Sequence, residues 1–502
     1  MRNFIKYSLY IFILSFICSC VDDKGNYTYK DEKDILPISI GEFEKEMTIE
    51  VGQTLSIIPE IEGMDNPDKY TYEWYVMEYQ VAGKAPERQD IGNTKDLNYK
   101  VTIDPGVWRL SYKVIDKETN IFSRAETKLN VISTAVDNKG WYILKDNGEE
   151  TDFDYINFEG TIYKDVLRKK NLQLPGTAIS MEYQQDRYYH NITDEHGNVV
   201  TLTNQSVFHV LSSKEIYSIN AKKIELFKNF EEQFYSTPEE CDPQYCIYVY
   251  HGTHFLQNAG RLYTVNGLIG TNIGKVFPIT GTYKLYKGGG IPMGLKNCIV
   301  YDEATNSLLV GDGYNDSFID MPDLKQDDSI YSFKHMPYSI VCIAHNCRSM
   351  KGQGYIVLKH KDTEEGALLR AKNSSSTAIT SFSIVPKESK LLKTDIVAPA
   401  FNADFVYFKH NNAVYSYENA QDLSLEDKEK EVISYPEGET ITAIKQAFST
   451  DINQLAVLTT KDEKWKLYIY DLLGESNPEI NPKPVATYEG EGNGRFLLFR
   501  SN

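Results

Sequence analysis

One motif recurs along most of this chain and limits the possible fold more than any other feature. Each copy has a short apolar run, a polar turn and a second run in which a tyrosine often stands between apolar residues, as in residues 207–219, 246–265, 299–310, 405–417 and 455–470. Hairpins at intervals of roughly 40 to 60 residues are typical of β-propeller blades with four antiparallel strands. The sequence therefore predicts a propeller of about seven blades. Six or eight blades, or an irregular β-sandwich of similar size, are the alternatives.

The last apolar stretch of the chain indicates how such a ring closes. Residues 495–500 have the pattern of a strand, which we expect to complete a blade that begins near Gly140. A closed ring protects strand edges that so many hairpins would otherwise expose. Two stretches have helical character instead: residues 222–234, with apolar residues at helical spacing, and the charged residues 423–432. We expect both stretches to be surface insertions.

A different pattern precedes the hairpins. Residues 35–133 alternate strands with turn signals about every 8 to 12 residues, which is typical of an immunoglobulin-like β-sandwich. Trp74 stands where such a sandwich keeps its core tryptophan, and Tyr112 is expected to be buried. The fold is therefore expected to be all-β, with a sandwich at residues 35–133 and the propeller at residues 134–502. The sandwich carries no cluster of ionisable groups, so we expect it to act as a spacer or docking module.

The N-terminus has the features of an export signal. Two cations precede an apolar run at residues 7–17, which is shorter than the roughly 20 residues of a membrane-spanning helix. The run ends in a small residue followed by Cys20, which resembles the lipobox of bacterial lipoproteins. The resemblance implies removal of residues 1–19, lipid attachment at Cys20 and a lipidated tether at residues 20–34. An ordinary secretory signal is the alternative.

The lipid would decide where the chain works. Each buried methylene contributes about 0.8 kcal/mol, so two or more acyl chains hold a protein firmly on a membrane. Asp22 and Asp23 follow the cysteine. They resemble the acidic tag that directs lipoproteins of Bacteroidetes-type bacteria to the outer face of the outer membrane. We therefore expect an outer-membrane, lipid-anchored protein that faces the extracellular side.

Two stretches resemble a known family. Residues 20–29, and the pair formed by Gly140-Trp141 and the Asp-Phe-Asp-Tyr at residues 152–155, are similar to PKD-like family lipoproteins of Bacteroidetes. Proteins of this family often accompany starch-utilisation-type uptake systems, in which a TonB-dependent transporter carries a lid lipoprotein. The resemblance implies a surface accessory that captures a nutrient, either a glycan or a peptide. Its expected partners are the transporter and its lid, and we expect no cofactor.

Charge and aromatic content narrow the choice of ligand. The formal charge is −18, and removal of the two signal cations gives 51 − 71 = −20. A surface this acidic argues against nucleic acid and anionic membrane surfaces as partners. The chain has 36 tyrosines, most of which must serve sheet packing. The others would suit sugars or peptide side chains, because a tyrosine combines a flat ring with a hydroxyl group.

Cysteine content leaves the redox state open. Five cysteines follow the tether: Cys241, Cys246, Cys298, Cys342 and Cys347. The pairs Cys241/Cys246 and Cys342/Cys347 have the spacing to close small loops in an oxidising compartment, but buried free thiols are an equal alternative. An odd number leaves at least one thiol unpaired. The absence of a close Cys-x-x-Cys pair disfavours a metal site.

Two short segments are candidates for ligand contacts. His251 and His254 follow a strand, and the sequence favours solvent-facing loop histidines over metal ligands because no third ligand is evident. Tyr314, Asn315 and Asp316 follow Gly-Asp-Gly with calcium-loop spacing, but the glutamate of such loops is missing. A tight turn held by side chain–backbone hydrogen bonds is therefore favoured there.

Catalytic motifs are weak throughout the sequence. No Gly-x-Ser-x-Gly elbow is present, and with 71 acidic residues no carboxylate pair is informative about glycosidase chemistry. We therefore expect no enzymatic activity and name no catalytic residue. A propeller-based glycan hydrolase or lyase and a structural or adhesive surface protein are the alternatives.

Overall fold

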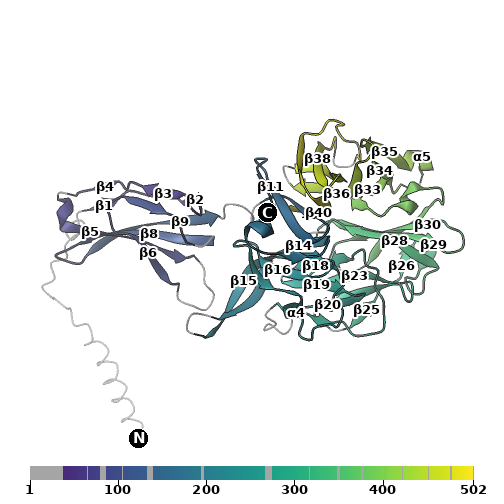
Figure 1. Cartoon of the computed structure of the whole chain (residues 1–502), viewed down its shortest axis with the longest axis horizontal. Coiled ribbons are helices and arrows are strands. Elements are labelled where there is room, and N and C mark those ends of the chain that lie inside the picture. Colours follow the sequence, from purple (N-terminus) through teal and green to yellow (C-terminus); the bar gives the residue numbers. More distant parts are fainter. Residues whose placement is uncertain are drawn as a thin grey trace, which may run out of the picture. The chain divides into compact units, whose positions relative to one another are not determined.

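The computed structural model describes residues 38–500 with internal gaps, and its residues fall into two compact units, Met1–Thr134 and Ala135–Asn502 (Figure 1). The gaps are residues 65, 80–85, 104–105, 133–138, 194–196, 251, 266–273, 316, 348–350, 375–377, 402, 421, 450–451 and 475–476. Cys20 and the acidic tag lie outside the described residues. Because the two units are separate bodies, each is described by itself.

The first unit is built around one five-stranded sheet. Its order is β2 (Glu46–Glu50), β9 (Phe122–Ile132), β8 (Gly106–Asp116), β5 (Tyr70–Glu78) and β6 (Arg88–Gly92). All neighbours are antiparallel except β2 and β9, which run parallel. Two small sheets share its core: β1 (Ser39–Ile40) with β4 (Ile61–Glu62), and β3 (Thr54–Ile57) with β7 (Leu97–Lys100). A short 3-10 helix, η1 (Pro67–Lys69), precedes β5.

Aromatic stacking fills this core as the sequence predicts. Trp74 and Tyr112 are fully buried, and their ring centroids lie 4.1 Å apart. Phe43 packs beside both rings, with its centroid 5.9 Å from that of Trp74 and 6.4 Å from that of Tyr112. The indole N–H of Trp74 donates to the carbonyl of Thr94 at 3.0 Å, so this buried polar atom has a partner. The prediction of an immunoglobulin-like core is confirmed.

The second unit contains seven sheets of four or five strands among its described residues. The first blade combines β40 (Asn493–Arg500), β10 (Gly140–Asp146), β11 (Glu150–Asn157), β12 (Ile162–Tyr163) and β13 (Leu174–Pro175). The second has β14 (Ala178–Thr193), β15 (Val199–Ser212), β16 (Ile216–Asn220) and β17 (Glu225–Lys228). The third has β18 (Pro243–Tyr250), β19 (Thr253–Asn258), β20 (Arg261–Thr264) and β21 (Phe277–Pro278).

The remaining four blades repeat the four-stranded order. The fourth blade has β22 (Ile291–Met293), β23 (Asn297–Asp302), β24 (Ser307–Asp312) and β25 (Phe318–Asp320), and the fifth has β28 (Tyr338–His345), β29 (Gln353–His360), β30 (Gly366–Lys372) and β31 (Ile379–Val385). The sixth has β32 (Val397–Pro399), β33 (Phe405–His410), β34 (Ala413–Glu418) and β35 (Glu429–Ser434). The seventh has β36 (Thr440–Ser449), β37 (Ile452–Lys461), β38 (Lys464–Asp471) and β39 (Ala486–Glu491). A separate hairpin, β26 (Leu324–Gln326) and β27 (Ser329–Tyr331), lies between two blades in the sequence.

The blades form a closed ring. Each blade begins with an innermost strand, and these strands contact one another in the order β40, β14, β18, β22, β28, β32, β36 and again β40. The C-terminal strand β40 is innermost in the first blade and pairs with β10 from Gly140↔Arg500 to Asp146↔Asn493. A seven-bladed propeller closed by the chain's last strand is therefore confirmed. The closure leaves no open end of the ring where a whole sheet edge would face solvent.

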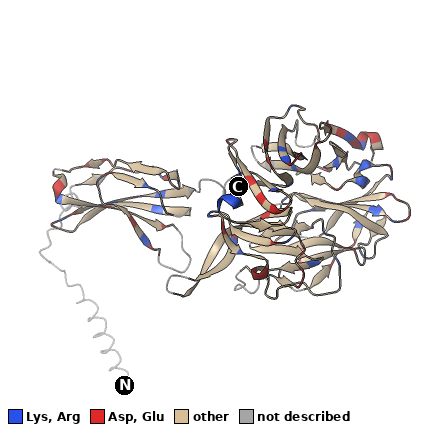
Figure 2. Cartoon of the chain, in the orientation of Figure 1, with Lys and Arg blue, Asp and Glu red and all other residues tan. Residues whose placement is uncertain are grey.

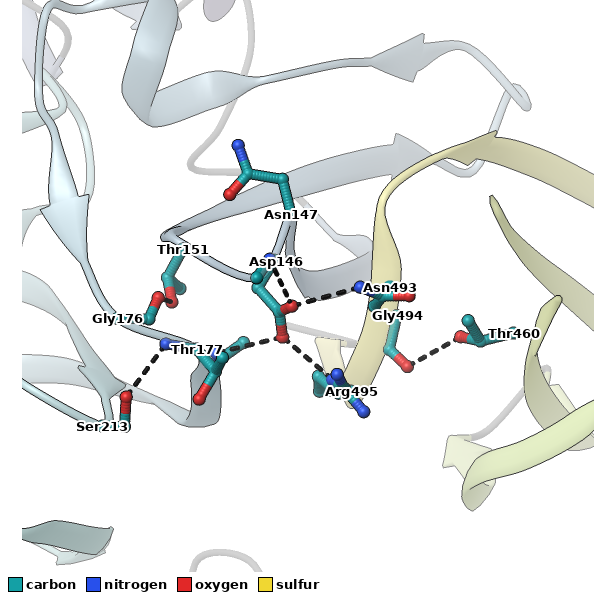
Figure 3. Close-up of polar contacts among 12 residues, drawn as sticks. Asp146, Asn147, Thr151, Gly176, Thr177, Ser213, Thr460, Asn493, Gly494 and Arg495 are labelled. Carbon is teal, nitrogen blue, oxygen red and sulfur yellow. Dashed lines mark hydrogen bonds and ion pairs between the residues drawn. The ribbon is translucent and has the colours of Figure 1, made fainter. Parts of the chain in front are cut away.

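Asp146 holds the closing strand in place (Figure 3). Its buried carboxylate accepts hydrogen bonds from Arg495 Nε at 2.9 Å and Asn493 Nδ2 at 3.3 Å, both on β40. It also accepts from the backbone N–H of Gly148 at 3.0 Å and of Ala178 at 3.2 Å. One side chain thus joins β10, β40 and the first residue of β14.

The Asp-Phe-Asp-Tyr segment, residues 152–155, has a structural role in the same blade. It belongs to β11, whose acidic residues are red in Figure 2. Asp152 caps the short helix α3 (Val166–Lys169) by accepting from the backbone N–H of Leu167 at 2.8 Å. Asp154 is fully buried and accepts from Lys145 Nζ and from the indole N–H of Trp465, both at 2.9 Å. Because Trp465 belongs to β38, this carboxylate also ties the first blade to the last.

The prediction of two helical insertions is wrong for most of the residues concerned. Residues 222–234 contain β17 and only one turn of helix, α4 (Phe230–Gln233), while residues 423–432 contain the equally short α5 (Leu425–Lys428) and the start of β35. Blade geometry overrides the local spacing here, because the outermost strands must pair with their neighbours. A 3-10 helix, η2 (Lys390–Lys393), precedes β32. Within the described residues, no helix has the length and apolar character needed to span a membrane.

Candidate functional site

The candidate site is a channel lined by the innermost strands of the propeller. A cavity of about 270 Å³ is bounded by residues of β14, β18, β28, β32, β36 and β40. A second cavity of about 120 Å³ follows it at the ends of the same strands, and we call this second cavity the channel mouth. Residues shared by the two cavities, among them Glu182, His345 and Lys445, mark the level at which they meet.

Aromatic rings supply much of the wall of the channel mouth. Tyr183, Tyr248, Phe401 and Phe499 come from four different blades and all line it. Tyr248 is half-buried and donates its hydroxyl to Asp186 at 3.2 Å. Burial and then the Asp186 carboxylate raise the pKa of Tyr248, so its hydroxyl stays protonated at neutral pH. Such rings offer flat apolar surfaces to a ligand with polar edges.

Arg500 is a buried cation at the end of β40. Its guanidinium carbon lies 3.4 Å from the ring centroid of Tyr183, and its Nη1 donates to the Tyr142 hydroxyl at 3.2 Å. Stacking on an aromatic face compensates in part for the lost hydration of a buried guanidinium. The arrangement holds positive charge at one side of the channel mouth.

His345 and Lys445 face the level where the two cavities meet. Burial, followed by the nearby Lys445 ammonium, lowers the pKa of His345 to about 3, so the imidazole is neutral at physiological pH. Its Nδ1 is buried and has no hydrogen-bond partner within the described residues. A buried ring nitrogen without a partner is costly, and such atoms are uncommon in native proteins.

Two amide side chains at the channel mouth are already used by the fold. Asn346 accepts from the backbone N–H of Gln353 at 3.0 Å and donates to the Pro399 carbonyl at 2.8 Å. Gln446 accepts from the backbone N–H of Phe401 at 2.7 Å and donates to Asn453 at 2.9 Å. These amides position the loops around the opening, and their polar atoms are engaged by the fold.

The predicted ligand histidines lie elsewhere. His251 is outside the described residues. His254 is in β19 and is 2% exposed, so the expectation of a solvent-facing loop histidine is wrong for this residue. Its ring lies 4.7 Å from that of His209, and burial, followed by the charge of Lys228, lowers its pKa to about 3. Strand β19 begins at Thr253, inside the expected turn, so His254 belongs to the strand. Its side chain therefore lies in the interface between two blades.

The predicted turn near residue 314 is confirmed as a turn. The carboxylate of Asp312 accepts from the backbone N–H of Tyr314 at 2.9 Å, from Asn315 Nδ2 at 2.8 Å and from Lys296 Nζ at 2.9 Å. These donors occupy the oxygens that a cation would need. Asp316 lies outside the described residues. The turn touches Thr253 through Gly313, but neither Tyr314 nor Asn315 lines the channel.

All five cysteines after the tether are free, and neither proposed pair forms a disulfide. Cys342 and Cys347 line the channel, and burial raises the pKa of both thiols, which disfavours the reactive thiolate. Among the described residues, no group of three or more His, Cys, Asp or Glu side chains is arranged to hold a metal ion.

Comparisons with known proteins give one family match and several solved structures of low similarity. The model of the PKD-like family matches residues 20–182, which include both stretches that carry the sequence resemblance. No curated protein matches the chain. Solved structures are similar only at low sequence identity, so they say nothing about chemistry.

Three solved structures illustrate this similarity. A quinoprotein alcohol dehydrogenase-like protein from Bacteroides thetaiotaomicron is 16% identical, with a TM-score of 0.43, over 91% of this chain and 96% of its own. A DUF4623 family protein from Bacteroides eggerthii is 12% identical, with a TM-score of 0.23, over 91% of this chain and 86% of its own. The WD40 domain of SCAP from fission yeast is 11% identical, with a TM-score of 0.22, over 79% and 85%.

Sequence reasoning missed the channel residues for a geometric reason. They come from the innermost strands of different blades, and nothing in the spacing of Glu182, His345, Lys445 and Arg500 indicates that they meet. The one usable signal is that, apart from β40, each innermost strand is the first strand of its blade in the sequence, so charged residues within those strands are candidates for the channel.

Proposed function

We propose that this chain is a surface-exposed outer-membrane lipoprotein that helps capture a glycan or a peptide for a TonB-dependent transporter complex. In this proposal it is not an enzyme, and the channel mouth of the propeller contacts the nutrient. The lipid on Cys20 would keep the propeller near the transporter.

One observation carries the proposal: the match to the PKD-like family model begins at residue 20, the cysteine of the lipobox-like sequence. The family resemblance and the proposed lipid attachment therefore fall on the same residue. The channel mouth supports the binding role, since its aromatic and charged side chains are gathered from several blades in an open cavity.

Tethering gives such a protein its advantage. A lipid on Cys20 would keep the chain near the membrane, which would raise the effective concentration of a bound nutrient at the transporter. The sandwich then serves as a folded spacer, because its aromatic core is complete without any ligand.

The test follows the N-terminus and the partners of a tagged full-length chain in a Bacteroidetes host. We expect the first peptide to begin at acylated Cys20, the chain to fractionate with outer membranes, and the transporter and its lid to co-purify. Cys20→Ala should release the chain from the membrane, whereas the matched control Cys18→Ala should not. An unmodified N-terminus in the wild type, or the absence of transporter components from the purified material, contradicts the proposal.

A further inference from the structure

We propose that the propeller channel binds one ring of a neutral sugar between Ser180 and His345. The ring would lie in the cavity of about 270 Å³ next to the channel mouth, which we call the inner cavity. This inference rests on the proposed nutrient-capture function and chooses the glycan over the peptide. It is argued from two buried polar atoms, from the charge balance of the inner cavity, and from its size and lining.

Two side-chain atoms in the wall of the inner cavity have no hydrogen-bond partner among the described residues. They are the hydroxyl oxygen of Ser180, a residue that is 8% exposed, and Nδ1 of His345. A buried polar atom that makes no hydrogen bond lowers stability, and native proteins keep few of them. Two such atoms in the wall of one cavity therefore indicate a hydrogen-bonding group that enters the cavity.

The two residues stand on opposite walls of the channel. Ser180 belongs to β14 and His345 to β28, and the ring order of the innermost strands between them is β14, β18, β22 and β28. These three steps are the largest separation that a ring of seven blades allows. A ligand that contacts both residues must therefore carry polar groups on opposite sides.

A sugar ring meets this requirement. Its hydroxyl groups are distributed around the rim of the ring, and each of them both donates and accepts hydrogen bonds, so they match a serine hydroxyl and either tautomer of an imidazole. Tyr245 on β18 adds a buried hydroxyl to the same wall, and its neighbour is the thiol of Cys298, which is a weak hydrogen-bond acceptor. Sugar hydroxyls can also replace water in such a cavity without loss of hydrogen bonds.

The charges in the wall of the inner cavity favour a neutral ligand. The charged lining residues have a formal sum of 2 − 2 = 0, and they are Lys445, Arg495, Glu182 and Asp395. Arg495 pairs with Asp146 at 2.9 Å and Asp395 with Lys409 at 3.3 Å, while Glu182 and Lys445 also have interactions within the chain. A charged ligand would therefore lose its hydration without gaining a counter-ion, whereas a neutral ligand avoids this cost.

The size and the apolar part of the wall fit one sugar ring. Ordinary small-molecule pockets have volumes of about 300 to 1,000 Å³, so a cavity of about 270 Å³ takes a small group. Val397, Ala398 and Leu497 supply apolar surface, against which the C–H face of a sugar ring can pack. Because His345 also lines the channel mouth, the rest of the glycan can extend along the aromatic rings there.

Calorimetry on the chain from residue 20 onwards tests the proposal, with Cys20→Ser to keep the chain in solution. The neutral sugar probes are maltotriose, cellotriose, mannotriose and galactotriose. Trigalacturonic acid is the charged counterpart of galactotriose, and N-acetyl-trialanine amide is a neutral peptide. We expect at least one neutral sugar to bind at least tenfold more tightly than the acid and the peptide do.

Variants then locate the bound sugar. Ser180→Ala should weaken its binding at least threefold and His345→Phe at least tenfold, because each variant removes a hydrogen-bonding atom from the inner cavity. The matched controls Ser381→Ala and His190→Phe should change the affinity less than twofold. They remove buried polar atoms that also lack a partner in the described part of the chain, but neither residue lines a channel cavity. Circular dichroism and the melting temperature confirm that each variant is folded, and Ser180→Ala decides the question if His345→Phe does not fold.

The outcomes separate the sugar site from the capture function. The sugar site is overturned if no neutral sugar binds, if the acid or the peptide binds more tightly than every neutral sugar, or if Ser180→Ala leaves sugar binding unchanged. The capture function is decided independently by co-purification with the transporter, so it can stand when the sugar site fails.

Discussion

Removal of the Asp146 carboxylate should open the propeller at its closure. The side chain is buried and accepts four hydrogen bonds: from Arg495 and Asn493 on β40, and from the backbone N–H groups of Gly148 and Ala178. Asp146→Ala leaves these donors without their acceptor. A neutral hydrogen bond is worth about 1 kcal/mol, and a buried donor that loses its acceptor costs about 1 to 3 kcal/mol. The half-exposed Arg495 contributes less, because water can replace the carboxylate. We therefore expect a loss of about 3 kcal/mol in the free energy of unfolding.

Urea unfolding followed by tryptophan fluorescence measures this loss, and hydrogen exchange locates it. The amides of β40 should exchange faster than those of the other innermost strands, because the closing strand is the part released. Asp320→Ala is the matched control: Asp320 pairs with Lys334 at 2.7 Å, but both side chains are at least half exposed. Its expected cost is below about 0.5 kcal/mol. The reasoning is refuted if Asp146→Ala and Asp320→Ala unfold at the same urea concentration, or if β40 keeps its protection.

Three further predictions concern the same unit. Trp465→Phe removes the indole donor of the buried Asp154 carboxylate, and urea unfolding should show a loss of about 2 kcal/mol. Gly490→Ala places a Cβ 2.6 Å from the Trp465 ring and should lower the free energy of unfolding by about 1 to 3 kcal/mol. The control Gly474→Ala, whose Cβ would lie 3.8 Å from its nearest neighbouring atom, should have little effect. Equal losses for the two variants would contradict this account of the packing. Burial depresses the pKa of His254 from 6.5 to about 3, so its share of stability is complete above pH 6.5 and is lost as the pH falls toward 3. At pH 5 that loss is about 2 kcal/mol, and His254→Phe should be less sensitive to the step from pH 7.5 to pH 5 than the wild type is.

The repeated hairpins predict most of the fold because their physics is local. A strand pair with a short turn can be recognised from alternation alone, and the C-terminal strand at residues 495–500 could be assigned to the blade near Gly140 from its pattern. Trp74 could be placed in the sandwich core for the same reason. Residues 222–234 were misread because Ile224, Phe227 and Phe230 happen to have helical spacing, although the first two belong to a turn and an outer strand.

The candidate site could not be predicted from local pattern. Lys445 and His345 are separated by most of two blades in the sequence, and only closure of the ring brings their strands to one channel. His254 shows the opposite failure, since a sequence motif that looks polar and loop-like lies inside a blade interface. Tertiary placement, and not residue type, decides which of these histidines a ligand can reach.

The most direct test of the central claim is whether a nutrient binds at the channel mouth. We would measure binding of a panel of oligosaccharides and peptides to the wild-type chain and to the double variant Tyr248→Ala and Phe401→Ala, with Phe122→Ala on the exposed face of the sandwich as the control. The account predicts that at least one compound binds the wild type and the control equally and that the double variant loses it. A compound bound equally well by all three proteins would contradict the assignment of the channel mouth as the binding site.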